Sequence, residues 1–367
     1  MRKERNNNYV TAEGRTAPGR ILGGIEMKKL LALVLALCMV FALCACGSSS
    51  APAADAPAAD APAADAPAAD APASSGSTDL AFTTGGETGT YYAFGSVLAQ
   101  YVSSKTDLNV VAVTGNGSQA NVEDLDAGEY QLAFCQSDVM SYAYSGTNLF
   151  DGAAVNSFSV AAALYMEQVQ IVTMNPDIKT VADLKGKNVS VGALGSGVYF
   201  NAIDVLAAYD LTLDDISPVY QSFGDSAESL KDNKIDAAFI VAGAPTTAIT
   251  DLATSGNVYL VEIDDEHVDK LIAASPYYSV YTVPADAYGM PADVQTVAVA
   301  AVVLVRNDVS DDAVYSFVST IFENAADIQH GKAAELSVDF GASMTSVPYH
   351  PGAAKYFAEK GLEVATA

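Results

Sequence analysis

The sequence has few basic residues. Its 367 residues include 18 lysines and arginines against 44 aspartates and glutamates, which gives a formal net charge of −26. Binding to nucleic acid needs clustered cations that neutralise phosphates, and attraction to anionic lipid needs the same. The composition therefore argues against a nucleic-acid partner and against docking on a membrane by charge.

Cysteine and histidine are also scarce. Four cysteines in 367 residues exclude a small scaffold held together by disulfides. The three histidines, His267, His330 and His350, lie far apart and form no metal-ligand spacing. The acidic segment 263–267 is expected to be an exposed turn rather than a site for a hard metal. We expect no metal and no cofactor.

The motifs of common enzymes are missing as well. The segment 83–92 lacks the GK[ST] of a phosphate-binding loop, and GALGSG at 192–197 has the wrong order for a dinucleotide fingerprint. Ser137 and Asp138 lie beside Cys135, but no nucleophile-elbow motif surrounds them. We therefore expect no catalytic residues.

The longest apolar run covers about 14 residues and ends near Leu43, too short for a bilayer span of about 20 residues. It follows Lys28 and Lys29, as in a signal peptide. The run ends in L-C-A-C-G, which resembles a bacterial lipobox, so we expect Cys46 to carry lipid. An ordinary signal peptide with incidental cysteines is the alternative. We assign residues 27–45 to the signal peptide and residues 1–26 to upstream sequence ahead of the true start.

A repetitive segment follows. APAAD occurs four times from residue 51, and a proline every five residues keeps such a chain extended or disordered. We assign residues 46–78 to a tether that links the lipid to a folded part outside the cytoplasmic membrane. The long tether favours the surface of a single-membrane bacterium, with a periplasm as the alternative. Residues 46–367 hold 11 basic and 41 acidic residues, and Arg306 is their only arginine. Cys135 has no partner there and is expected to be a small buried side chain.

The folded part, from Asp79, alternates between strand and helix patterns. This alternation predicts an α/β fold with a parallel sheet and right-handed crossovers. The segment 159–175 is too long for an ordinary strand and predicts two strands that meet near Glu167. Two α/β units joined by such crossings predict two lobes around a cleft. The expected strands are 80–85, 108–115, 130–138, 235–243 and 296–306, and the expected helices are 90–104, 117–129 and 198–210.

Glycine and hydroxyl residues gather where predicted strands pass into helices, at 83–92, 114–119 and 192–200. Open α/β sheets bind ligands at such joints, and a helix N-terminus offers free N–H groups to an anion. The alternative is that these residues only cap helices. Three joints in succession favour a shared small anionic or zwitterionic ligand.

Several segments resemble the TAXI family of solute-binding proteins from TRAP transporters. They include TTGGETGTYYAFGSVLAQYV, VTGNGSQANVEDLDAGEYQLAFCQSDV, ALYMEQVQIV and DLKGKNVSVGALGSGV, and the likeness covers 79–361. The family pairs an acidic residue with proline where this chain has Glu167 and Gln168. The resemblance implies a type II periplasmic-binding-protein fold, with lobe I formed by 79–170 and 281–367 and lobe II by 171–280. It also implies a membrane permease as partner, a monomer, and glutamate or a related amino or dicarboxylic acid as ligand.

The resemblance places ligand-binding residues at the three joints and beside them. Tyr92 and Tyr199 are expected to wall the pocket with Tyr91. Glu167 or Asp138 can hold an ammonium group or satisfy backbone donors. The residues that match the family's binding motif are Gly86, Thr90, Tyr91, Ser118, Asn121, Gln136, Ser137, Ser196, Gly197 and Val198.

The expected mechanism is capture by lobe closure, with flexing near Glu167. Many carboxylate receptors use a bidentate arginine. Arg306 lies at the end of the last predicted strand and is expected to be structural, so backbone N–H groups and hydroxyls would bind the carboxylate. The alternatives are the binding lipoprotein of an ABC importer, a chemosensory receptor of the same fold, and a surface-anchored enzyme.

Overall fold

The computed structural model describes residues 78–367. The predictions for the upstream extension, the signal peptide, the lipid-bearing Cys46 and the tether up to residue 77 lie outside the described residues. The first strand begins at Asp79, where the folded part was predicted to start. In the described part of the chain, no helix has both the length and the apolar character needed to span a bilayer.

The strands form one mixed sheet in the order β2-β1-β3-β10-β4-β7-β5-β6, with β8 beside β4 and β9 beside β10. The strands are β1 (Asp79–Thr83), β2 (Asn109–Val113), β3 (Leu132–Gln136), β4 (Phe158–Thr173), β5 (Asn188–Ser190), β6 (Ser217–Val219), β7 (Ala237–Ala242), β8 (Tyr259–Leu260), β9 (Ser279–Val283) and β10 (Val294–Arg306).

The helices connect and cover these strands. The α-helices are α2 (Thr90–Lys105), α3 (Ser118–Asp126), α4 (Ser137–Ser145), α5 (Val198–Ala208), α6 (Phe223–Lys231), α7 (Thr247–Ala253), α8 (Asp265–Ala274), α9 (Asp311–Glu323), α10 (Val338–Gly341) and α11 (Pro351–Glu359). The short 3-10 helices are η1 (Asn148–Phe150), η2 (Val181–Leu184), η3 (Leu213–Asp215), η4 (Ala285–Ala287), η5 (Ala325–Asp327) and η6 (Gly331–Glu335).

Two parallel α/β units occupy the two ends of the sheet. In the first unit, β1, β2 and β3 run parallel and are connected through α2 and α3, and α4 follows β3. In the second unit, β5, β6 and β7 run parallel, with α5, α6 and α7 around them. The predicted fold class, α/β with two such parts, is confirmed. The predicted parallel pairing holds within each unit, whereas β4 and β10 between them pair antiparallel with their neighbours, so the sheet is mixed.

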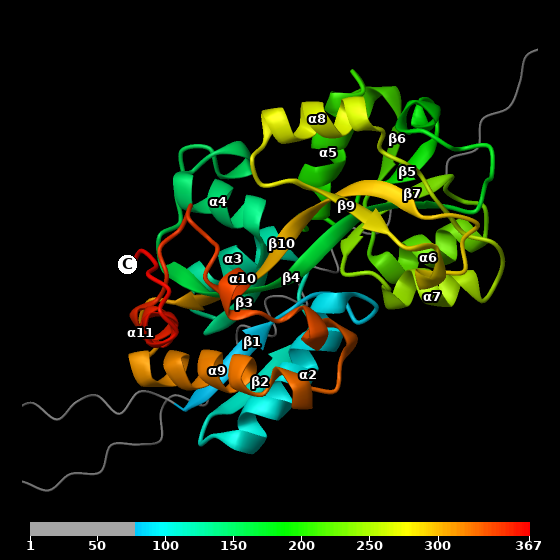
Figure 1. Ribbon diagram of the computed structural model, residues 1–367. Coiled ribbons are helices and arrows are strands. Elements are labelled where there is room, and N and C mark those ends of the chain that lie inside the picture. Colours follow the sequence, from blue (N-terminus) through cyan, green and yellow to red (C-terminus); the bar gives the residue numbers. More distant parts are fainter. Residues whose placement is uncertain (1–77) are drawn as a thin grey trace, which may run out of the picture. The chain divides into compact units, whose positions relative to one another are not determined.

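The central strand β4 is continuous, so the prediction of two strands meeting near Glu167 is wrong. Residues 158–168 of β4 pair with β10, and residues 168–172 pair with β7, so the strand passes from one partner to the other at Gln168. The pairing with β10 shifts register between Ala301 and Val302 and again between Val303 and Leu304. Such bulges add local twist, which lets two long strands stay paired. In Figure 1, β4 and β10 run together from one unit to the other.

Each unit has its own hydrophobic core. One large cluster fills the first unit and includes Phe82, Phe94 and Phe134, all fully buried. The second unit has two smaller clusters, one containing Phe239 and the other Ile240, whose side chains point to opposite faces of β7. Two cores joined by two long strands leave the space between the units to be lined by loops and helix ends.

Two expectations about single residues are confirmed. Cys135 is a free, fully buried cysteine in the core of the first unit. Arg306 binds Asp308 through its guanidinium and donates to the Gly128 carbonyl at 2.7 Å, so its role is structural.

Candidate ligand-binding site

A cavity of about 140 Å³ lies between the two units, where strands pass into helices. An engineered protein cavity of roughly this volume, ~150 Å³, holds a benzene molecule, so there is room for one small organic solute. The lining residues are Gly85, Gly86, Gly89, Thr90, Tyr91, Gly115, Asn116, Gly117, Ser118, Gln136, Glu167, Ala193, Ser196, Gly197, Val198, Ser222, Phe223, Val241 and Ala242.

Four helices begin at this cavity without a side-chain cap. The first residues of α2, α3 and α5 follow glycines, and α4 follows Gln136, and none of the four N-cap residues accepts a side-chain hydrogen bond from its helix. In the same structure, the N-cap side chains of α6, α8, α9 and α11 each accept a backbone N–H. The first turns of the four uncapped helices therefore bring partial positive charge and backbone N–H groups without a side-chain cap to the cavity. Their N-caps are Gly89, Gly117, Gln136 and Gly197.

Glu167 supplies the carboxyl group of the cavity. It projects from the middle of β4 and is 2% exposed. Tyr165 Oη donates a long hydrogen bond of 3.4 Å to Glu167 Oε1. Burial, together with the charge of Asp138, raises the pKa of Glu167 to about 8. Tyr91, Tyr165 and the charge of Lys332 act to lower this pKa, and burial outweighs them. Such a buried carboxyl can accept a donor or cation from a ligand.

Two hydroxyl groups at the cavity have no hydrogen-bond partner within the described chain. They are Tyr91 Oη and Ser196 Oγ, and both residues are less than 9% exposed. The Tyr91 ring is fixed by stacking on Phe134, with centroids 4.6 Å apart. Burial raises the pKa of Tyr91, and the nearby Glu167 carboxyl raises it further. The geometry between Tyr91 Oη and Glu167 is nevertheless not that of a hydrogen bond. Buried polar atoms are almost always paired, so these two mark places for ligand atoms.

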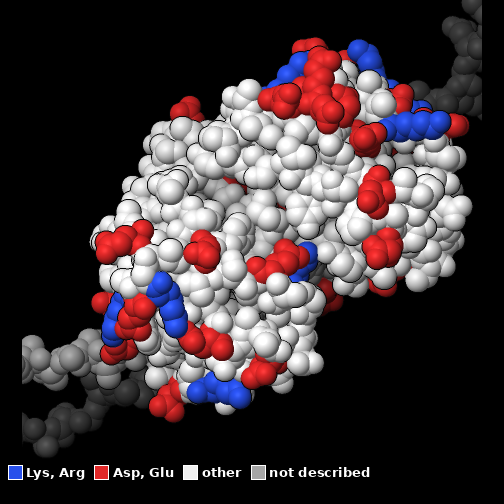
Figure 2. Space-filling model, in the orientation of Figure 1, with Lys and Arg blue, Asp and Glu red and all other residues white. Residues whose placement is uncertain are grey.

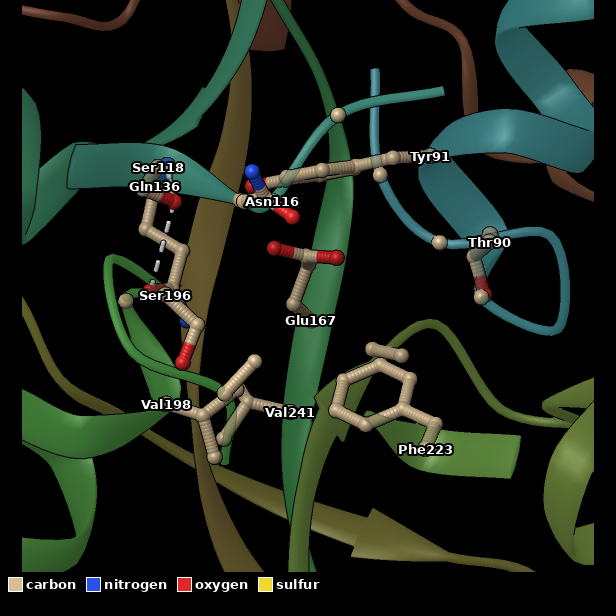
Figure 3. A pocket seen from close by; sticks show the side chains of 18 of the residues that line it. Thr90, Tyr91, Asn116, Ser118, Gln136, Glu167, Ser196, Val198, Phe223 and Val241 are labelled. Carbon is tan, nitrogen blue, oxygen red and sulfur yellow. Dashed lines mark hydrogen bonds between the residues drawn. The ribbon is translucent and has the colours of Figure 1, made fainter. Parts of the chain in front are cut away.

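The opposite wall is apolar. Figure 3 shows Glu167 between Tyr91 on one side and Val198, Val241 and Phe223 on the other. The second unit supplies these three side chains, from α5, β7 and α6. The first unit and β4 thus supply mainly polar groups, and the second unit supplies an apolar patch together with Ser196 and Ser222.

The structure brings nine of the predicted site residues to the cavity. They are Gly86, Thr90, Tyr91, Ser118, Gln136, Glu167, Ser196, Gly197 and Val198.

The other five do not line it. Asn121 is fully buried and its amide donates to the carbonyl oxygens of Thr84 and Phe134, at 2.6 and 2.8 Å. Ser137 Oγ accepts the Ala300 N–H at 3.1 Å. The remaining three are Tyr92, which is half-buried, Tyr199, which packs on Phe200 and Tyr220, and Asp138.

A chain of hydrogen bonds behind the cavity connects the two units, and we call it the interunit network. Gln136 Nε2 donates to Asn201 Oδ1 at 2.9 Å, and Asn201 Nδ2 donates to Asp138 Oδ2 at 2.9 Å and to Tyr278 Oη at 2.8 Å. Tyr278 Oη donates in turn to Asp204 Oδ2 at 2.9 Å. Burial raises the pKa of Asp138 to about 7. Asn201 belongs to α5, so this single amide ties the second unit to the wall of the first.

Direct contacts also close the cavity. The Ala120 N–H donates to the Gly195 carbonyl at 3.0 Å, and Thr90 Oγ1 donates to the Gly243 carbonyl at 2.9 Å. At Gly197 the approach is so close that a Cβ would overlap the side-chain amide oxygen of Gln136. The described units are therefore in contact around the cavity.

Sequence reasoning missed part of the lining. Asn116 lies within a joint that was recognised, but Ser222, Phe223 and Val241 were not singled out. Ser222 and Phe223 follow β6, a strand of three residues that includes Pro218, and such a short strand has no periodic pattern to find. Val241 is an apolar strand residue, and nothing in the sequence distinguishes it from the residues of the hydrophobic core.

Charged side chains are spread over the face shown in Figure 2. Acidic and basic side chains lie over both units, and a small group of both signs lies near the middle of the view. In the described part of the chain, no group of histidine, cysteine and acidic residues is arranged to hold a metal ion.

Comparison with solved structures returns binding proteins. The periplasmic aliphatic sulphonate binding protein SsuA from Escherichia coli is 16% identical, with a TM-score of 0.41 and coverage of 76% of this chain and 82% of that one. The GluR0 ligand-binding core from Nostoc punctiforme, in complex with (L)-glutamate, is 13% identical, with a TM-score of 0.41 and coverage of 67% and 93%. The alkanesulfonate-binding SsuA from Xanthomonas axonopodis pv. citri, bound to MOPS, is 16% identical, with a TM-score of 0.46 and coverage of 78% and 85%.

At such low identities these likenesses assign no ligand to this chain. A family model gives the firmer result, because its match runs over residues 82–361, nearly the whole described part of the chain. The chain belongs to the NMT1-like family.

Proposed function

We propose that this protein is an extracytoplasmic solute-binding receptor. It captures one small carboxylate by closure of its two units and delivers it to a membrane permease. The observation that carries the proposal is the cavity between the two units, at which four uncapped helices begin and two buried hydroxyls lack partners. Such groups cost free energy when they face nothing, and a bound carboxylate would satisfy them.

Closure follows from the way the units are joined. Among the described elements, β4, β10 and the short strand β9 connect the two cores, so flexing of these strands separates lobe I (79–170 and 281–367) from lobe II (171–280). Ligand enters the open form and binds the N-termini of the first unit. The second unit then brings Ser196 and Gly197 over it. Ligand shifts the equilibrium by its higher affinity for the closed form.

The partner we propose is a TRAP-type permease, on the strength of the TAXI-like segments. A permease of the ABC type or a chemosensory role would use the same closure. A reconstituted transport assay separates them, because uptake through a secondary permease follows an ion gradient, whereas ABC uptake requires ATP hydrolysis. Uptake driven by ATP alone would contradict the TRAP proposal.

The receptor function is tested by a thermal-shift and calorimetry screen of amino acids and carboxylates on the purified full-length chain. A true ligand raises the free energy of unfolding by RT ln(1 + [L]/Kd), and the melting temperature rises as a result. If none of these solutes shifts the melting temperature, the receptor proposal is wrong. Turnover of a bound solute would instead indicate the surface-anchored enzyme.

The proposed location rests on Cys46 and the tether. Cys46→Ala should move the protein from the membrane fraction to the soluble fraction, and a Cys44→Ala variant serves as the matched control. Retention of the Cys46 variant on membranes would contradict the lipid anchor.

A further inference from the structure

The charge of the cavity limits what it can bind. Glu167 is the one ionisable acid among the described residues that line it, and none of those residues is lysine, arginine or histidine. Lys332 acts on Glu167 from outside, but its ammonium is bound to Glu335 at 2.6 Å and does not line the cavity. A cationic ligand group therefore has one natural partner, the Glu167 carboxyl.

An anionic ligand group has a different partner. The N-termini of α3 and α5 meet at the cavity, where Ala120 of the first binds Gly195 beside the second. The unpartnered Ser196 Oγ lies at the same point. Two helix N-termini and a free hydroxyl suit one carboxylate.

The rest of the cavity suits an uncharged group. Phe223, Val241 and Val198 face Glu167 across the space (Figure 3), and Ala193 and Ala242 also line the cavity. A second ligand carboxylate placed here would lose its hydration without meeting a cation, and it would repel an ionised Glu167. Desolvation of an unpaired charge is costly enough to exclude such a ligand from a closed site.

We infer that the ligand is a small zwitterionic amino acid with an apolar side chain. Its carboxylate meets the N-termini of α3 and α5 with Ser196, its ammonium meets Glu167, and its side chain packs on Phe223 and Val241. This inference rests on the proposed receptor function and narrows it. It selects against glutamate and the dicarboxylates that the TAXI-like segments imply.

The test compares leucine, valine, glutamate and succinate by calorimetry on the purified full-length chain and on Glu167→Gln. Glutamine has the shape of the carboxyl group without its charge, and exposed Glu228→Gln is the matched control. We expect leucine or valine to bind at least tenfold more tightly than glutamate and succinate. Glu167→Gln should weaken that binding at least tenfold, and Glu228→Gln should leave it unchanged.

The outcomes separate this inference from the receptor proposal. Tighter binding of glutamate or succinate than of leucine and valine overturns the inference and leaves the receptor function standing. Equal binding of leucine by the wild type and by Glu167→Gln overturns the role of Glu167. Failure of all four solutes to bind counts against the receptor function and the inference together.

Discussion

The cavity and the interunit network lie side by side and differ in whether their buried polar groups have hydrogen-bond partners. In the cavity, Tyr91 Oη and Ser196 Oγ are buried without partners. In the network, Asn201 and Tyr278 use their donors and acceptors on neighbouring side chains, and Asp138 is bound through Oδ2 while its Oδ1 has no partner among the described residues. A group left unpaired in the protein is available to a ligand, and a group paired across the units stabilises their contact. The comparison predicts that changes in the cavity alter selectivity, whereas changes in the network alter closure for every ligand.

The largest effect is expected at Gly197, where the units meet most closely. Gly197→Ala adds a Cβ that overlaps the Gln136 amide in the closed form, while the helical backbone at Gly197 tolerates alanine. Overpacking costs about 1–3 kcal/mol, so affinity should fall up to about a hundredfold for all ligands. Calorimetry measures the loss. Gly331→Ala is the control, because a Cβ there meets nothing within 4 Å and Gly331 does not line the cavity.

The pH dependence of binding distinguishes an amino-acid ligand, which carries an ammonium group, from an acidic ligand that carries none. Burial raises the pKa of Glu167 to about 8, in surroundings that include Tyr91, Tyr165, Asp138 and Lys332. An ammonium binds the ionised form, so affinity for an amino acid should rise by up to about tenfold from pH 6 to pH 7 and level off above pH 8. Titrations across this range measure it. Affinity that falls as pH rises would indicate a protonated Glu167 donating to an acidic ligand.

A smaller and unselective effect is expected at Asn201. Asn201→Ala removes the link between Gln136 and the carboxyl of Asp138 and leaves buried groups unpaired. At about 1 kcal/mol, the closed form should lose roughly fivefold in affinity for every ligand. Asn257→Ala, at an exposed position, is the control. A change that affects one ligand class only would show that Asn201 acts in selection rather than in closure.

The smallest effects come from two tyrosines that differ only in their partners. Tyr278→Phe removes a hydroxyl that is bonded to Asn201 and Asp204, so stability to urea should fall by about 1 kcal/mol. Tyr91→Phe removes an unpaired buried hydroxyl, so the free energy of unfolding of the empty protein should stay the same or rise. Equal destabilisation by both substitutions would contradict the distinction between cavity and network.

Much of this site could be predicted from the sequence, because glycine and hydroxyl residues ahead of a helical pattern have a local signature. That signature placed Thr90, Ser118 and Ser196 at strand-to-helix joints, and the structure brings all three to the cavity. Side chains that act through long-range contacts have no such signature. Asn201 looks like any polar residue within a helix, and its role depends on two units that meet only in the fold.

The fold shows the same limit. The α/β alternation is local and was predicted, whereas the continuity of β4 depends on pairing with β10, more than a hundred residues later in the chain. Strands usually have roughly 3–10 residues. An apolar segment as long as 159–175 therefore predicts two strands rather than one. The bulges that keep these strands paired leave no mark in the composition.

The central claim is that the cavity binds both the ammonium and the carboxylate of an amino acid. The most direct test compares leucine with two analogues that each lack one of these charged groups. Isocaproate keeps the carboxylate and the side chain, and isoamylamine keeps the ammonium and the side chain. Calorimetric titration of the full-length chain at pH 8 should show binding of leucine and at least tenfold weaker binding of both analogues. Isocaproate binding as tightly as leucine would contradict the account, because Glu167 would then have no cation to receive.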